Sequence, residues 1–282
     1  MTIQLLGKIL VQEMADDIIA RVQTCKERGI LPTLALLRVG SRPDDMSYER
    51  TAMRRAESLG ITTKQIVLDD NATQEELEAA IDAINNDEAV HGCLMFRPLP
   101  AHLREQDLCN RLAPEKDIDG ISYASLASVF TGDNIGYPPC TASACCALLD
   151  HYGIKVEGKK VVVIGRSLVI GKPVSLMMLN RHASVTMCHS RSEGLQELVR
   201  AADIVICAVG RARMFNKYFF VPGQVVLDVG INFDAEGNLC GDVDYDAVAP
   251  IVDYITPVPG GIGSVTTQIT MDHVVRAAEA RI

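Results

Sequence analysis

A glycine-containing turn after a buried strand pattern is the first place where residue types and spacing suggest chemistry. Residues 160–164 read KVVVI, and Gly165, Arg166, Ser167 and Gly171 follow before a helical stretch. Glycines at such a turn let the backbone approach a pyrophosphate, which then lies at the N-terminus of the next helix. The strict G-x-G-x-x-G spacing is absent, so a plain strand-to-helix turn is the alternative interpretation.

The residues after the next strand pattern bear on which dinucleotide would bind. A site for NAD places an Asp or Glu about 20 residues past the glycines, where it binds the ribose hydroxyls. This chain instead offers Ser190 and Arg191 there, with Arg166 in the glycine turn. A hydroxyl and guanidinium groups suit a 2′-phosphate. We therefore predict NADP as the cofactor, with a solvated surface charge as the alternative for Arg191.

A parallel sheet is needed to position these residues, and the sequence predicts two blocks that alternate strands and helices. The first block has expected strands at 33–39, 65–68 and 92–95, and expected helices at 12–27, 47–59 and 73–85. The second has a helix at 143–152 and strands at 161–164, 184–188, 204–208 and 225–228. Such alternation is typical of parallel strands with helices on both faces.

The stretch that joins the two blocks, after residue 100, is expected to be rich in loops. Residues 133–140, which read DNIGYPPC, predict a domain boundary. A last helix at 267–280 is expected to return to the first domain. We therefore predict an α/β fold with two domains, one made of residues 1–139 plus 266–282 and the other, of Rossmann type, made of residues 140–265.

Composition excludes several classes of protein. The chain has 282 residues, of which 48% are hydrophobic, and this content excludes disorder. No apolar run approaches the roughly 18 residues of a membrane-spanning helix. The net charge of −9 argues against a nucleic-acid partner, because an acidic chain repels phosphate backbones.

Cysteine usage predicts a reduced, cytoplasmic protein. The nine cysteines form no C-x-x-C pair, and no cysteine–histidine group has the spacing of a metal site, so we expect no metal. An odd count and the lack of a signal-peptide pattern argue against a disulfide framework.

Several strings in the two blocks belong together. The second block contains GRSLVIGKP at 165–173, DVGIN at 228–232 and TPVPGGIG at 256–263, and the first contains RPLP at 97–100 and PEKDIDG at 114–120. In this order, and with Tyr48 eight residues after Gly40, they resemble the bifunctional methylenetetrahydrofolate dehydrogenase/methenyltetrahydrofolate cyclohydrolase family. The resemblance covers essentially the whole chain.

The resemblance implies a three-layer α/β folate domain at the N-terminus, a Rossmann-type NADP domain, a cleft between them and a homodimer. Family members oxidise methylenetetrahydrofolate to the methenyl form and hydrolyse that to formyltetrahydrofolate. By resemblance, Tyr48 would stack on the aminobenzoyl ring and Asp119 would bind the amino-pyrimidine edge of the pterin; a core tyrosine and a turn-forming aspartate are the alternatives. The backbone of Pro259, Gly260 and Gly261 would approach the substrate, and Ile231 would lie beside the nicotinamide.

Two departures from the family pattern concern the catalytic pair. The family's lysine, four residues after the tyrosine, is Ala52 here, and the glutamine before its L-P-L-P string is Phe96. Hydride loss from a methylene bridge needs orientation but no protein base, whereas hydrolysis must move a proton. We therefore expect a dehydrogenase whose cyclohydrolase activity is lost or weak. The alternatives are a fully bifunctional enzyme, a non-catalytic folate-binding relative, and another two-domain dehydrogenase acting, for example, on shikimate.

Overall fold

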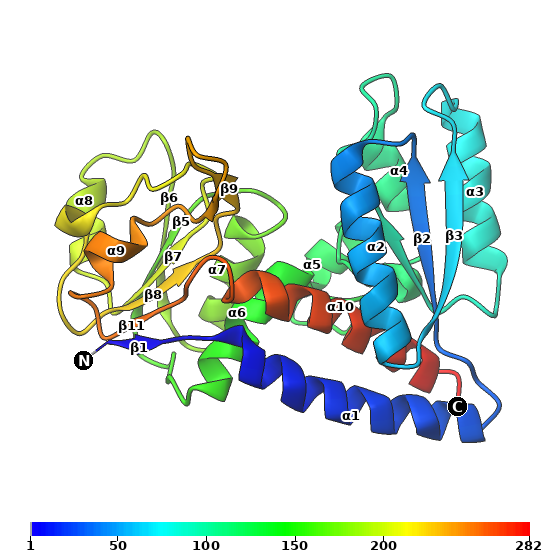
Figure 1. Cartoon of the computed structure of the whole chain (residues 1–282), viewed down its shortest axis with the longest axis horizontal. Helices are drawn as coiled ribbons and strands as arrows, with labels where there is room; N and C mark the ends of the chain where they lie inside the picture. Colours follow the sequence, from blue (N-terminus) through cyan, green and yellow to red (C-terminus); the bar gives the residue numbers. More distant parts are fainter. Residues whose placement is uncertain (1) are drawn as a thin grey trace. The chain divides into compact units, whose positions relative to one another are not determined.

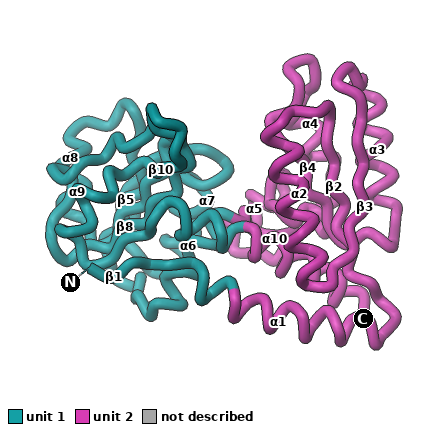
Figure 2. The backbone as a smooth tube through the Cα atoms, viewed as in Figure 1, with its two compact units in different colours: residues 1–11, 141–266 teal, residues 12–140, 267–282 magenta. Residues whose placement is uncertain are grey.

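The computed structural model describes residues 2–282 and divides into two compact units (Figures 1 and 2). Unit 1 contains Thr141–Thr266 together with the start of the chain up to Val11, and unit 2 contains Gln12–Cys140 and Thr267–Ile282. The start of the chain, which sequence reasoning placed with the first domain, lies in unit 1 because β1 (Ile3–Gln4) pairs with β11 (Tyr254–Ile255).

Unit 2 is built on a three-stranded parallel sheet in the order β3–β2–β4. Its strands are β2 (Thr33–Val39), β3 (Thr62–Leu68) and β4 (Gly92–Met95). Its helices are α1 (Gly7–Glu27, whose first residues lie in unit 1), α2 (Pro43–Ser58), α3 (Gln74–Asn86), α4 (Glu105–Arg111), η1 (Pro114–Lys116), α5 (Tyr123–Thr131) and α10 (Ile262–Glu279, mostly in unit 2).

Strand β2 explains why this unit has three layers. All seven of its residues are buried, and successive side chains point to opposite faces. Leu34 and Leu36 join a cluster with residues of α1, α2 and α10, whereas Ala35 and Leu37 join one with residues of α3 and α4. A sheet with helices on both faces is therefore present, and the last helix packs in this unit, as the sequence predicted.

Helix boundaries in unit 2 follow from local sequence. Helix α2 begins at Pro43, four residues earlier than predicted, because proline at the first helical position and Asp44 and Asp45 in the first turn favour a helix start. Helix α3 has the predicted capping box between Thr73 and Glu76. The stretch after residue 100 was expected to be rich in loops; it contains loops, and also α4 and α5, which the sequence analysis did not predict.

Unit 1 contains a six-stranded parallel sheet in the order β1–β11–β8–β7–β5–β6. The long strands are β5 (Lys160–Ile164), β6 (Ser184–Cys188), β7 (Ile204–Cys207) and β8 (Val225–Asp228), and β9 (Asn232–Phe233) and β10 (Leu239–Cys240) form a separate hairpin. The helices are α6 (Cys140–His151), α7 (Gly171–Asn180), α8 (Leu195–Arg200), η2 (Lys217–Phe219) and α9 (Tyr245–Val248). The predicted α/β fold with parallel sheets is confirmed.

The order of strands in unit 1 creates a switch point. From β5 the chain crosses to β6 on one side and then to β7 on the other, so the loops after β5 and β7 diverge at the carboxyl edge of the sheet. Open α/β sheets bind ligands at such a point.

Among residues 2–282, no helix combines the length and the apolar character needed to cross a membrane.

Candidate active site

The glycine turn of unit 1 lies at this switch point. Gly165 follows β5 with φ = +131°, and a Cβ there would overlap the carbonyl oxygen of Ala208, which follows β7. A Cβ on Gly171 would overlap the carbonyl oxygen of Gly165. Only glycine therefore fits at either position, and the turn leads directly into the N-terminus of α7. The alternative of an unspecialised turn does not explain two glycines forced by backbone contact.

Polar and basic side chains surround the turn. Ser167 anchors it, because the backbone N–H of Ile170 donates to the Ser167 Oγ at 3.2 Å. Arg166 in the turn and Ser190 and Arg191 after β6 are exposed. Within residues 2–282 neither arginine forms an ion pair, and the four residues that follow β6 include no carboxylate. The structure thus leaves cationic groups available at the end of β6.

Two buried carboxylates, which sequence reasoning did not single out, hold the other loops at this edge. Asp242 accepts hydrogen bonds from the backbone N–H groups of Val209 and Arg211, at 2.6 and 2.8 Å. Asp228 accepts from Gly230 at 3.0 Å and from Val243 at 2.8 Å. Burial raises the pKa of Asp228 to about 6, and these backbone donors oppose that rise. The DVGIN string is therefore a braced loop.

The loop that Asp228 braces presents Ile231, which is 67% exposed. Gly263 is near it, since a Cβ on Gly263 would lie 4.0 Å from the Ile231 Cδ1. Pro259 and Gly260 are exposed in the preceding turn, and Gly260 has φ = +107°. Gly261 is buried, and a Cβ there would lie 2.7 Å from the carbonyl oxygen of Pro257. The predicted residues of this turn and Ile231 thus lie in one unit with the glycine turn.

In unit 2, Tyr48 lies on α2 and faces apolar side chains. Its ring meets that of Phe96 edge-on, with 5.8 Å between centroids. Ala52, one helical turn from Tyr48, is 1% exposed and shares a buried cluster with Phe96, which is 4% exposed. The Tyr48 hydroxyl lies near the side chain of Thr267 on α10. Loss of hydration and the nearby charge of Asp119 raise the pKa of Tyr48.

Asp119 lies in the KDIDG loop beside a cation. The distance from Arg97 Nη2 to Asp119 Oδ2 is 4.0 Å, and Arg97 Nη1 is 3.8 Å from Glu105 Oε1. Burial raises the pKa of Asp119 to about 6, with the Arg97 charge opposing that rise and the Asp117 charge adding to it. The structure brings Asp119 and Tyr48 close enough for their charges to interact.

The KDIDG loop is held by its other residues. Asp117 is fully buried and accepts hydrogen bonds from the backbone N–H groups of Ile121 and Ser122 at 3.0 and 2.8 Å. Gly120 has φ = +69°, and a Cβ there would lie 2.6 Å from the backbone nitrogen of Pro139. Lys116 Nζ donates to the carbonyl oxygens of Ile84, Asn85 and Asp87 at 2.6–2.9 Å. Asp119 is therefore the carboxylate of this loop that is left for a ligand.

Most of the other amines and imidazoles of unit 2 are bonded to groups other than Ala52 and its neighbours. Lys64 pairs with Asp87 at 2.6 Å, and His91 Nδ1 accepts from the backbone of Thr33. His102 bonds the carbonyl oxygen of Ala72 at 2.9 Å. Along the described part of unit 2, Lys26 is the other amine, and it lies beside Gly60 past the end of α2.

A buried cysteine and histidine lie next to the KDIDG loop. His273 on α10 bonds the carbonyl oxygen of Ile118 at 2.8 Å, and its Nδ1 is 3.6 Å from the Cys140 Sγ. Burial lowers the pKa of His273 to about 4 and raises that of Cys140 well above its usual value. A neutral thiol beside a neutral imidazole is not an activated nucleophile, so we assign this pair to packing.

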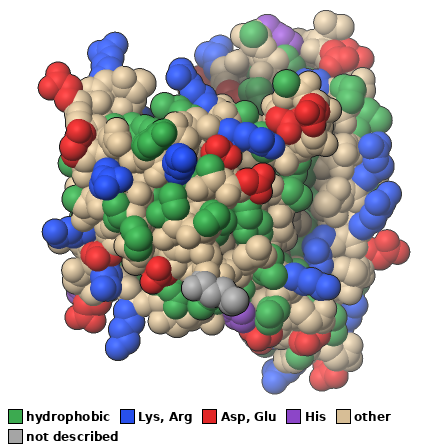
Figure 3. All heavy atoms as spheres, turned by 60° about the vertical axis from the view of Figure 1, so that its left-hand side comes forward, with side chains coloured by type: hydrophobic (Ala, Val, Ile, Leu, Met, Phe, Trp, Pro, Cys, Tyr) green, Lys and Arg blue, Asp and Glu red, His purple; other side chains and the backbone are tan. Residues whose placement is uncertain are grey.

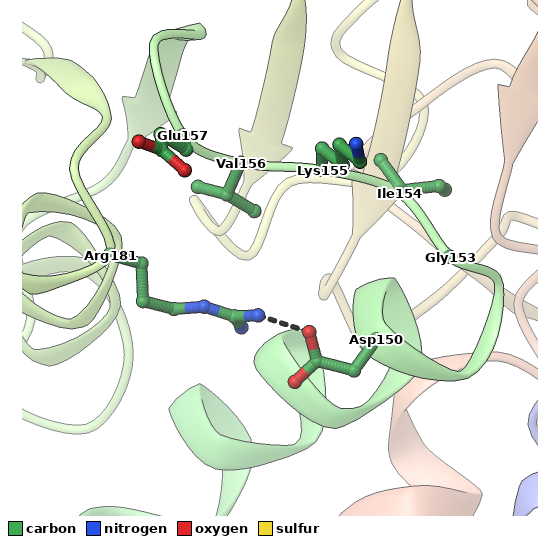
Figure 4. A pocket seen from close by; sticks show the side chains of 7 residues that line it. All are labelled: Asp150, Gly153, Ile154, Lys155, Val156, Glu157 and Arg181. Carbon is green, nitrogen blue, oxygen red and sulfur yellow. Dashed lines mark hydrogen bonds and ion pairs between the residues drawn. The ribbon is translucent and has the colours of Figure 1, made fainter.

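A surface pocket of about 470 Å³ in unit 1 is separate from these residues. It is lined by residues of α6, the loop after it and Arg181, which pairs with Asp150 (Figure 4). It shares no residue with the glycine turn.

On the face shown in Figure 3, acidic and basic side chains are interspersed without a large area of one charge. In the described residues 2–282, no group of three His, Cys, Asp or Glu side chains is placed to hold a metal ion.

These features define the chain as a two-unit α/β protein with a dinucleotide-type glycine turn. Comparison with known proteins then gives the family. Residues 5–119 match the catalytic domain of tetrahydrofolate dehydrogenase/cyclohydrolase, and residues 139–282 match its NAD(P)-binding domain. The chain belongs to the tetrahydrofolate dehydrogenase/cyclohydrolase family. The alternative of a shikimate or amino-acid dehydrogenase is therefore wrong.

Individual relatives agree with this assignment over the full length. A curated protein of Clostridioides difficile, "Bifunctional protein FolD", is 48% identical over 97% of this chain and 95% of its own. The crystal structure of the bifunctional enzyme FolD from Campylobacter jejuni has a TM-score of 0.98 at 34% identity, covering all of both chains. The Trypanosoma brucei enzyme, solved with NADP and an inhibitor, has a TM-score of 0.93 at 31% identity, covering 99% of this chain and 98% of its own.

Proposed function

We propose that this protein oxidises 5,10-methylenetetrahydrofolate to 5,10-methenyltetrahydrofolate with NADP, and that its hydrolysis of the product to 10-formyltetrahydrofolate is lost or weak. The first part rests on the match of both units to the family and on the glycine turn at the switch point. The second rests on one observation, which is that buried apolar side chains, Ala52 and Phe96, flank Tyr48.

Unit 1 fits NADP. The turn that contains Gly165, Ser167 and Gly171 would hold the pyrophosphate at the N-terminus of α7, because the two glycines have no side chain to keep the backbone away and the first N–H groups of a helix point at a bound anion. Arg166, Ser190 and Arg191 would bind the 2′-phosphate, because free guanidinium groups and a hydroxyl form charge-assisted hydrogen bonds to phosphate. Ile231 would cover the nicotinamide from its braced loop. Bound NADP⁺ supplies the hydride acceptor.

Unit 2 would hold and orient the folate. Asp119 would accept two parallel N–H bonds from the amino-pyrimidine edge of the pterin, which fixes the ring in its plane. Tyr48 would stack on the aminobenzoyl ring. From unit 1, Pro259, Gly260 and Gly261 would offer backbone to the substrate. Hydride loss is driven by a folate nitrogen lone pair, so the chain contributes orientation, which is worth several kcal/mol in such reactions.

Hydrolysis of the methenyl product requires proton transfer, which orientation of the folate alone does not provide. A water must attack and a proton must move, which needs a side chain whose pKa is near the working pH. The methyl group of Ala52 and the ring of Phe96 cannot carry a proton. Lys64, Lys116 and the three histidines of unit 2 are bonded elsewhere, and Lys26 lies past the end of α2, so none of those side chains replaces the missing pair.

Two assays on the purified protein test the proposal. The first follows NADPH formation from methylenetetrahydrofolate, and catalytic efficiency is expected to be higher with NADP than with NAD. The second follows the absorbance of supplied methenyltetrahydrofolate, which is expected to decay at the buffer rate. Decay well above that rate would instead favour the fully bifunctional alternative, which is the name given to the curated relatives. Absence of NADPH formation would favour a non-catalytic relative.

A gain-of-function variant gives the sharper test. Ala52→Lys with Phe96→Gln restores an amine and an amide beside Tyr48, and methenyltetrahydrofolate hydrolysis is expected to rise above the parent's. A matched control places the lysine on the exposed side of α2, as Thr51→Lys. Equal rates for the double variant, the control and the parent would show that the two substitutions do not explain the loss.

We further propose that the protein is a homodimer and works in the cytoplasm. The dimer rests on family resemblance, and light scattering during gel filtration tests it. The nine cysteines are all free and buried, which favours a reducing compartment. The net charge of −9 argues against binding to nucleic acid.

A further inference from the structure

Gln268, on α10, is a fully buried polar side chain without a polar partner in the described chain. Its exposed fraction is 0%, and neither its Nε2 nor its Oε1 makes a hydrogen bond to any of residues 2–282. Burying a carboxamide without partners costs free energy, and native structures rarely leave such groups unpaired. A leucine or methionine would fill the same volume without this cost, so the amide calls for an explanation.

Its surroundings place Gln268 at the folate side of unit 2. It follows Thr267, whose side chain lies near the Tyr48 hydroxyl. On a helix, residues three and seven positions further along lie on the same face. For Gln268 these are Met271 and Val275, and both belong to the buried cluster that contains Ala52 and Phe96. The face of α10 that carries Gln268 therefore contributes to the same buried cluster as Ala52 and Phe96.

Another buried carboxamide, that of Gln224, shows how this fold can satisfy such a side chain. Gln224 in unit 1 is 2% exposed, and its Nε2 donates to the carbonyl oxygens of Val199 and Ala202 while its Oε1 accepts from Val221. Gln268 has the same chemistry and the same burial but none of these partners. A ligand that reaches the amide would supply the partners that the chain does not.

We propose that Gln268 is a substrate-binding residue, whose carboxamide donates to and accepts from polar atoms of the tetrahydrofolate ring system bound beside Tyr48. A primary amide is neutral and carries both a donor and an acceptor, so it matches the ring carbonyl and ring N–H of a pterin whose amino-pyrimidine edge is held by Asp119. The amide does not titrate, and so it gives orientation without restoring proton transfer. This inference rests on the proposed function.

The test replaces the amide by an apolar group of similar shape. In Gln268→Met, the KM for methylenetetrahydrofolate is expected to rise about tenfold, which corresponds to one or two lost hydrogen bonds. The KM for NADP should stay unchanged, and the melting temperature of the free protein should be unchanged or higher. The matched control is Gln224→Met, which breaks satisfied bonds and should lower the melting temperature while both KM values stay unchanged.

The outcomes distinguish a failure of this inference from a failure of the proposed function. If the parent forms no NADPH, the proposed function fails by itself. If the parent is active and Gln268→Met keeps the parent's KM for the folate, the inference alone is wrong. It is also wrong if Gln268→Met loses as much thermal stability as Gln224→Met, or if both Gln268→Met and Gln268→Leu fail to fold, because the amide then serves the structure.

Discussion

The charge pair of Arg97 and Asp119 leads to a quantitative prediction about pH dependence. If Asp119 binds the pterin as a carboxylate, kcat/KM for methylenetetrahydrofolate must fall below its pKa, which burial raises to about 6. The acid limb of kcat/KM reports groups of the free enzyme. The parent should therefore lose about half of its kcat/KM at pH 6 relative to pH 8, and about tenfold more with each further pH unit.

Arg97→Gln removes the cation that favours the charged form of Asp119. Unit charges 4 Å apart interact by about 4 kcal/mol at an effective dielectric constant of 20 and by about 1 kcal/mol in bulk water. The closest atoms are 4.0 Å apart, and the side chains are 23% and 28% exposed, so we take about 1–2 kcal/mol. That corresponds to about one pKa unit, upward.

The assay is the initial rate of NADPH formation at subsaturating folate between pH 5.5 and 8.5. The ratio of kcat/KM at pH 8 to that at pH 6 should be about 2 in the parent and about 10 in Arg97→Gln, from the same pKa arithmetic. Arg104→Gln is the matched control, because Arg104 pairs with Asp107 on the surface. An acid limb that stays in place or moves to lower pH in Arg97→Gln would refute the role given to this pair.

Four further variants test other parts of the structure. Asp119→Asn should abolish folate turnover, yet it should raise the free energy of unfolding at pH 7.5 by about 1–3 kcal/mol, as measured by urea unfolding. Because the pKa of Asp119 is raised in the folded state, this gain in stability should shrink as the pH falls through 6. Gly165→Ala should raise the KM for NADP at least tenfold, because φ is +131° and the Cβ meets Ala208, while the KM for folate holds. Lys116→Met should lower the free energy of unfolding by about 2–4 kcal/mol, since three buried carbonyl groups lose their donor. Arg191→Ala should raise the KM for NADP about tenfold and leave the KM for NAD unchanged in initial-rate assays.

Sequence reasoning predicted the elements whose side chains carry a clear pattern. The strand at 33–39 has the observed bounds, since seven consecutive buried residues match a strand covered on both faces. The capping box at Thr73 is likewise present. By contrast, β1 and β11 have two residues each, and a strand that short cannot show the alternation of hydrophobic and polar residues by which strands are predicted. Their pairing joins the start of the chain to unit 1, and only tertiary structure shows it.

The parts of the site that escaped prediction are buried polar groups. Asp228 and Asp242 are single acidic residues in loop strings, and only their several backbone donors mark them as braces. Gln268 is a single polar residue in the sequence of α10. A polar residue in a helix normally lies on the exposed face, so the sequence gives no sign that Gln268 is buried. Burial and hydrogen-bond partners depend on residues far away in the chain, so no local pattern reveals them.

The two reactions of this family place unequal demands on a protein, and we propose that this chain separates them. Oxidation requires that the folate be held, and the groups that would do so, Tyr48 and Asp119, are present and lie close together. Hydrolysis also requires a proton carrier, and at that position the chain has packed Ala52 and Phe96 into a buried cluster. A random loss of function would be expected to damage the glycine turn and the braced loops as well, yet both are intact. The pattern therefore favours a retained dehydrogenase over general decay. Under the proposed function, hydrolysis of the methenyl product would fall to another catalyst or to the slow reaction in water.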